Sequence, residues 1–245
     1  MNGIECFLVF MMVCAPEEQK ALQRKDSVTV SAGISKEQLA SEQRLNDVLT
    51  MGDQARRSGN YAVAIRQFER ARDMVRSDKL LAEQQDRVLD KLGQAYLGGG
   101  RASDAVAAYT ALLELRHDDC QPASDSPSQC AEAKQSLGYS KMLSGDFQGA
   151  LPILQDAEAS FGTAAKPDDP EEYRTIETKK QGETRVLISA ALFRLAKRQE
   201  AVAAIKSAIQ QLKKVESNTN VQQSIRDSAA DSRQKAEKQL ELIER

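Results

Sequence analysis

Cysteine and histidine are the residue types in this chain best suited to redox or metal chemistry, and it has four cysteines and one histidine. Cys120 and Cys130 enclose the stretch CQPASDSPSQC, which is rich in proline and serine. A disulfide between them would close a small surface loop and tie the end of one helix to the start of the next. Two free thiols in a cytosolic protein are the alternative.

Other chemistry has little support in the sequence. His117 and Asp119 lie near Cys120, but this set falls one clear ligand short of a metal site. The run Gly98-Gly99-Gly100 invites a phosphate-loop interpretation, yet no Lys-Ser or Lys-Thr pair follows it and no strand precedes it. No nucleophile motif accompanies the single histidine. We therefore expect no metal, no cofactor and no catalytic activity.

The composition favours helix and excludes two classes of partner. The chain holds 34 basic and 36 acidic residues, so no net field would draw it to nucleic acid or to an anionic membrane. Alanine, leucine, glutamine and the charged helix formers are abundant, and aromatic residues make up only 4%, with no tryptophan. This composition predicts helix throughout and no dense globular core.

Residues 1–15 resemble a secretory signal peptide. The stretch 4–15, IECFLVFMMVCA, has the length of a signal core and is too short to span a membrane. Val13 and Ala15 suit a cleavage site, whereas the leader MNGIE has no basic residue and Pro16 would follow the cut. A lipoprotein site at Cys14, a misassigned start and a short apolar helix packed on the rest of the chain are the alternatives. We expect an exported, periplasmic bacterial protein without a stable membrane span after processing.

The elements that position these residues are predicted to be helices in pairs. A polar linker, residues 16–35, would lead to a capping box at Ser35 and Gln38, in which the hydroxyl accepts a backbone N–H and the amide reaches back. The expected helices are residues 36–57, 61–77, 80–97, 102–116, 129–143, 147–161, 170–195, 199–214 and 221–243. We expect the charged first half of the 170–195 helix to stand free of the core, and Asp169 to cap it. Residues 36–214 would form one repeat domain, and residues 220–245 a capping helix.

Small residues recur along these helix pairs at a fixed spacing. The first helix of each pair carries Gly52, Gly93, Gly138 or Ser189, and the second carries, twelve residues later, Ala64, Ala105, Ala150 or Ala201. The turns hold Gly59, Gly100, Gly145 and Ala196, and bulky residues follow at Phe68, Tyr109, Leu154 and Ile205. Small residues would let paired helices touch, and the bulky residue would fill the gap to the next pair.

This pattern, over residues 45–209, resembles the tetratricopeptide repeat family. The match is most specific in the first two pairs, where Tyr61 and Tyr96 also fit; the fourth pair is degenerate, and the spacing exceeds the usual 34 residues of the family. The resemblance implies an all-α fold, a right-handed superhelix of about four helical hairpins with a C-terminal capping helix. A simple helical bundle with coincidental spacing is the alternative.

The resemblance also implies a concave groove lined by the first helix of each pair. By position, the candidate peptide- or protein-binding residues are Asn46, Leu49, Asp53, Arg56, Arg87, Asp90, Gln94, Tyr139, Met142, Val186 and Phe193, with Leu97, Glu132, Gln135, Glu183 and Ala190 beside them. Some family members hold a peptide carboxylate with lysine and asparagine on these helices. Leu49 and Asp53 stand where that set would be, which argues against a receptor of that kind.

Three functions are consistent with these features. The first is an exported scaffold that binds a protein or peptide in the groove without catalysis. The second is a cytosolic, peptide-sensing regulatory protein, in which the charged stretch 171–183 would contact a partner domain or a second copy. The third is a homo-oligomer that assembles through the repeats and the terminal helix.

Overall fold

The computed structural model describes residues 35–117, Cys120 and residues 127–245. The signal-like leader, the linker and Asp119 lie outside these residues. The described chain forms two compact units, residues 35–115 and residues 116–245, so the expected repeat domain of residues 36–214 is shared between two units. Within the described residues every regular element is a helix, which confirms the all-α prediction.

The N-terminal unit contains two helical hairpins. Its elements are α3 (Lys36–Arg57), α4 (Tyr61–Ser77), the 3-10 helix η1 (Lys79–Gln84), α5 (Gln85–Gly98) and α6 (Ala102–Leu115). The helix expected at 80–97 therefore begins with a separate 3-10 segment. Asp78 explains this start, because its carboxylate accepts a hydrogen bond from the Leu80 backbone N–H at 3.0 Å.

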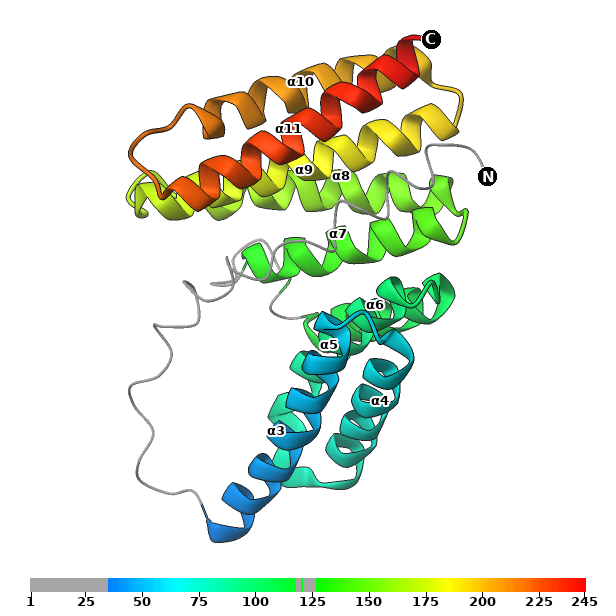
Figure 1. The fold of residues 1–245 in the computed structure, drawn as a ribbon, viewed down its shortest axis with the longest axis vertical. Helices are drawn as coiled ribbons and strands as arrows, with labels where there is room; N and C mark the ends of the chain where they lie inside the picture. Colours follow the sequence, from blue (N-terminus) through cyan, green and yellow to red (C-terminus); the bar gives the residue numbers. More distant parts are fainter. Residues whose placement is uncertain (1–34, 118–119, 121–126) are drawn as a thin grey trace. The chain divides into compact units, whose positions relative to one another are not determined.

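The C-terminal unit contains two further hairpins and one more helix (Figure 1). These are α7 (Pro127–Leu143) with α8 (Phe147–Ala164), α9 (Glu171–Arg194) with α10 (Arg198–Glu216), and α11 (Gln223–Glu244). Each helix packs on the next along the chain, and α11 packs on both α10 and α9. The last helix thus covers the final hairpin, as expected of a capping helix.

Side-chain caps fix several helix starts at the expected residues. Ser35 Oγ accepts from Gln38 N at 3.1 Å, and Asp146 Oδ1 accepts from Gly149 N at 2.8 Å. The Gln38 amide donates to Glu42 instead of reaching back, so the capping box is half formed. Asp169 does not cap α9, because its carboxylate accepts from the Lys166 N–H; Pro170 takes the cap position without a side-chain bond.

The hairpin turns use the positions that the repeat spacing predicted. Gly59, Gly100 and Gly145 have φ of 75°, 72° and 90°, and Ala196 has φ of 60°. A left-handed residue ends each first helix, and three of the four turns place glycine there, where a Cβ would be strained.

Close helix approach within each hairpin explains the small residues of the first helices. A Cβ on Gly93 would come within 2.6 Å of Tyr109 Cζ, and one on Gly138 within 2.6 Å of Leu154 Cγ; Gly52 faces Phe68 in the same way. The bulky residues therefore fill the space over the glycine of their own hairpin, not the gap to the next one. In the fourth hairpin Ser189 replaces glycine, and its buried hydroxyl donates to the Ala201 carbonyl at 2.9 Å.

The first half of α9 is buried, contrary to the expectation that it stands free. Thr175, Ile176, Glu177 and Lys179 are all buried. Ile176 belongs to an apolar cluster with Val215, Val221, Ile225 and Ala229, which come from α10, α11 and the loop between them. The charged residues on the same turns are paired: Glu177 accepts from Ser128 of α7, and Lys179 Nζ lies 3.2 Å from Glu183 Oε1 of α9. No helix of the described residues is long and apolar enough to cross a membrane.

Candidate peptide-binding face

In the N-terminal unit, the predicted groove residues of α3 and α5 lie side by side and bond to one another. Arg87 Nη1 donates to Asn46 Oδ1 at 3.1 Å, across the two helices. Lys91 Nζ donates to Asp53 Oδ2 at 2.7 Å, and Gln94 Nε2 donates to Asp90 Oδ2 at 2.8 Å. We call this set, completed by Arg56, the polar row: Asn46, Asp53, Arg56, Arg87, Asp90, Lys91 and Gln94.

Two atoms of the polar row are buried and have no hydrogen-bond partner. They are Asp53 Oδ1 and Arg56 Nε. Arg56 Nη2 lies 3.8 Å from Asp53 Oδ1, within ion-pair range but beyond a hydrogen bond. A buried donor and a buried acceptor without partners are uncommon, since each costs about 1–3 kcal/mol when left unsatisfied. The Arg56 and Asp53 side chains as a whole are 29% and 21% exposed, so the polar row reaches the surface at these two residues.

The C-terminal unit has an equivalent polar set on α7 and α9. Lys180 Nζ lies 2.6 Å from Glu132 Oε1 and 2.9 Å from Glu177 Oε1, and Gln135 Nε2 donates to Thr184 Oγ1 at 2.7 Å. Burial lowers the pKa of Lys180, but the carboxylates of Glu132 and Glu177 outweigh it and hold that pKa above its usual value. Lys180 is therefore a fixed cation that joins the two helices.

Other predicted groove residues lie in the interior. Leu49, Tyr139, Met142 and Val186 are 1%, 2%, 3% and 0% exposed, and Phe193 is half-buried. Burial raises the pKa of Tyr139 to about 12, as expected for a phenol removed from water. These four side chains serve helix packing in this structure, and the function proposed below does not depend on them.

The C-terminal helix is the reason for the burial around Val186. Gln239 of α11 donates to the Val186 carbonyl at 3.3 Å, and Ser232 of α11 donates to Glu183 at 2.6 Å. The face of α9 that the family positions assign to a groove is therefore covered by α11. Accessible candidate residues are concentrated on α3 and α5.

Sequence reasoning missed Lys91 and Lys180, which bind the first helices of neighbouring hairpins together. A signal for both exists in the repeat spacing. Asn46 and Arg87 are 41 residues apart, while Asp53 and Lys91 are 38 apart, about one helical turn less. A search for opposite charges one turn short of the repeat spacing would have found Lys91.

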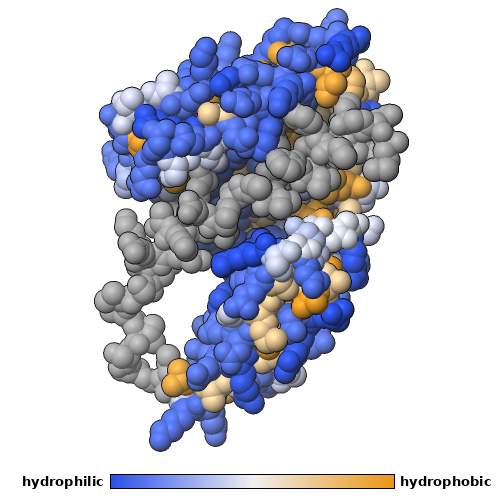
Figure 2. All heavy atoms as spheres, viewed as in Figure 1, coloured by the Kyte–Doolittle hydropathy of each residue, from blue (hydrophilic) through white to orange (hydrophobic). Residues whose placement is uncertain are grey.

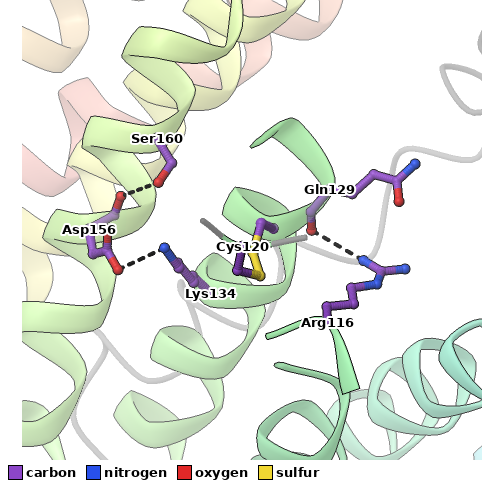
Figure 3. Close-up of a disulfide and its surroundings, with 7 residues drawn as sticks. Arg116, Cys120, Gln129, Lys134, Asp156 and Ser160 are labelled. Carbon is purple, nitrogen blue, oxygen red and sulfur yellow. Dashed lines mark hydrogen bonds and ion pairs between the residues drawn. A yellow bond between two sulfur atoms is a disulfide. The ribbon is translucent and has the colours of Figure 1, made fainter. Parts of the chain in front are cut away.

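The Cys120–Cys130 pair stands at the start of α7 (Figure 3). The two Cα atoms are 5.5 Å apart, within the usual range for a disulfide, and the structure joins the two sulfur atoms. Arg116 Nη1 donates to the Gln129 carbonyl at 3.3 Å beside them. The two cysteines thus have the Cα separation that the predicted loop-closing disulfide requires. No group of three or more potential metal-binding side chains occurs among the described residues.

Comparison with known proteins supports the fold. No family model matches the chain, and no curated protein matches it. Among solved structures, one described as "kinesin light chain nearly identical TPR-like repeats" from Podosopora anserina has a TM-score of 0.54 and 17% identity, over 82% of this chain and 93% of that one.

Two further structures were also found. The MamA protein has a TM-score of 0.49 and 18% identity, over 82% of this chain and 93% of that one. The TPR2AB domain of yeast Sti1 in complex with pHSP90 has a TM-score of 0.39 and 11% identity, over 80% of this chain and 99% of that one. The hairpin geometry and the kinesin-light-chain likeness together define the class: this chain is an all-α helical-repeat protein with a tetratricopeptide-repeat-like fold.

Proposed function

We propose that this chain is a non-catalytic scaffold that binds an extended segment of a protein partner along the polar row of α3 and α5. The observation that carries this proposal is the set of partly exposed polar side chains that joins α3 to α5, in which Asp53 Oδ1 and Arg56 Nε have no hydrogen-bond partner within the described residues. A peptide backbone offers both an N–H for the carboxylate and a C=O for the guanidinium. In an extended segment the N–H and C=O of one residue point to the same side, so one residue of a bound peptide can offer both groups to Asp53 and Arg56.

The rest of the polar row supports a peptide over a small charged ligand. Asn46, Arg87, Asp90 and Gln94 present amide, cationic and acidic groups in succession along two helices, so no single charge dominates. Mixed polar groups suit an extended chain with its own donors and acceptors, whereas a compact anion or cation needs convergent charge of one sign.

Peptide selection tests this assignment. Peptides selected from a displayed library against the full chain should bind Arg56→Ala and Asp53→Ala roughly tenfold or more weakly than wild type, because each variant removes a charged hydrogen-bond partner. Arg72→Ala is the matched control, since Arg72 pairs only with its neighbour Asp73 on α4 among the contacts described. Affinities would be measured by titration calorimetry. Unchanged affinity in both variants, with unchanged melting, would reject the polar row as the binding face.

We further propose that the chain is exported to the periplasm, with residues 1–15 as its signal peptide. The Cys120–Cys130 geometry supports this proposal, because disulfides persist in oxidising compartments. Intact mass of the protein from its native cells, before and after thiol reduction, should show loss of the leader and a gain of two hydrogens on reduction. An unprocessed Met1 chain with free Cys120 and Cys130 would exclude export and favour the cytosolic alternative.

A further inference from the structure

The first hairpin and the start of η1 enclose an apolar groove. We call it the leading groove; it lies between α3 and α4, has a volume of about 450 Å³, and is floored by Val48, Met51, Met74 and Leu81. Met51 is 52% exposed, although most of its neighbours along α3 with apolar side chains are buried. Apolar patches also interrupt the mainly hydrophilic surface in Figure 2.

Comparison between hairpins shows that the leading groove is a face that other hairpins cover. Met51 directly precedes the small residue Gly52. The residues in the same position of later hairpins are Leu92, before Gly93, Leu137, before Gly138, and Ile188, before Ser189, and all three are buried. Leu92 and Ile188, which are 2% and 4% exposed, lie on helices that pack on the preceding helix of their own unit, α5 on α4 and α9 on α8. The position of Met51 is therefore one at which other hairpins bury an apolar side chain, and no described residue buries Met51 in this way.

The walls of the leading groove carry one acidic and one basic side chain, so the groove of one copy is complementary in charge to the groove of a second copy. Asp47 on α3 and Arg70 on α4 both line it, are exposed, and make no hydrogen bond or ion pair with another described residue. The other acid of the groove, Asp78, already has partners: hydrogen bonds from the Ser41 hydroxyl and the Leu80 N–H, and then the charge of Arg44, lower its pKa. One free acid and one free base thus stand on opposite walls of an apolar floor.

We propose that the leading groove is a homodimer interface, in which a second copy of this chain packs through the same groove about a two-fold axis. In a two-fold interface every contact occurs twice: if residue i of one copy contacts residue j of the other, residue j of the first copy also contacts residue i of the second. Asp47 of each copy then pairs with Arg70 of the other, and the methionines of both copies fill the floor between them. Methionine suits such a face because its flexible side chain adapts to the opposing surface.

Charge exchange tests the two-fold arrangement directly. Sedimentation equilibrium of the full chain, over a concentration series reaching the millimolar range, should show a monomer–dimer equilibrium. Asp47→Arg and Arg70→Asp should each weaken it roughly tenfold or more, because each places like charges opposite one another twice. The double variant Asp47→Arg/Arg70→Asp should return to near the wild-type dissociation constant.

The two single variants provide the sharpest readout. Each single variant alone places like charges opposite one another in its own homodimer. When the two variants are mixed, Asp47→Arg and Arg70→Asp should form a heterodimer, because each interface contact then joins a base to an acid. Leu115→Glu is the matched control, since Leu115 is 47% exposed but does not line the leading groove, and it should dimerise as wild type does.

Three outcomes would overturn the proposal. They are a wild-type chain that stays monomeric throughout the series, single variants that fail to associate on mixing, and a dimer that survives Met51→Glu with unchanged circular dichroism. A wild-type monomer that dimerises only after removal of residues 1–34 would assign the groove to the chain's own N-terminal segment instead. None of these results bears on peptide binding at the polar row, which lies on a different face of α3.

Discussion

At the scale of single residues, the backbone conformation of the turns is the feature that the sequence predicts most completely. The sequence spacing predicted one turn residue per hairpin, and Gly59, Gly100, Gly145 and Ala196 all have positive φ. This feature was predictable because a left-handed residue after a helix has a strong preference for glycine, which a single sequence displays.

Ala196 is the exception among these turns, and it offers a stability test. Its φ of 60° strains an alanine, so Ala196→Gly should raise the free energy of unfolding by about 1 kcal/mol. Gly145→Ala is the matched reverse change, because a Cβ there would meet no atom within 4 Å and only the backbone penalty remains. It should lower stability by a similar amount.

Denaturant unfolding of both variants, followed by circular dichroism, checks this pair. Both residues lie in the C-terminal unit, so the same transition should shift in opposite directions. A loss of stability in Ala196→Gly would mean that the greater freedom of glycine in the unfolded chain outweighs the strain.

Residue burial was harder to predict from the sequence than residue conformation. Leu49, Tyr139, Met142 and Val186 stand at family positions that face a groove, yet they are buried. Helical periodicity identifies the face on which a side chain lies, but it carries no information on which distant element packs over that face. The burial of Val186 depends on Gln239 and its helix, 53 residues further along the chain.

At the scale of helices, α9 shows how charge misleads a sequence-based prediction. Its first half is rich in charged residues, which usually indicates a solvated helix. Its buried charges are instead paired, Glu177 with Lys180 and Ser128, and Lys179 with Glu183. The Glu177–Lys180 and Lys179–Glu183 pairs have the three- and four-residue spacing that a helix brings together. The bond from Ser128 to Glu177 joins residues 49 positions apart, and no local pattern predicts it.

The disulfide is an element-scale feature because it fixes the start of α7. It closes a short loop, since the two cysteines are 10 residues apart, and the loop-entropy model gives about 2–3 kcal/mol for a loop of this size. Reduction, or Cys120→Ser/Cys130→Ser, should therefore destabilise the C-terminal unit by that amount. Amide hydrogen exchange should become faster in α7 and remain unchanged in α3.

A control and a contrary result are available for the disulfide. Adding reductant to Cys120→Ser/Cys130→Ser should change nothing further in the C-terminal unit. Equal exchange in α7 of the oxidised and reduced wild-type chain would show that helix packing alone orders this element.

At the scale of the whole molecule, the all-α repeat class was predictable and the division of the chain was not. The spacing of small residues predicted the hairpins, because the two helices of each hairpin must approach closely and only small residues allow this. The division between residues 115 and 116 falls where the sequence shows only another connection between helices. Contacts across a connection depend on how two surfaces fit, which no local pattern encodes.

The two ends of the repeat array differ in a way that bears on how the chain could grow by duplication. Because α11 already packs on α9 and α10, a hairpin inserted after Glu216 would have to displace it and rebuild that contact. A hairpin inserted before Lys36 would instead meet the exposed side chain of Met51 and the apolar floor of the leading groove. Gene-level expansion of this array, natural or engineered, is therefore easier at its amino-terminal end.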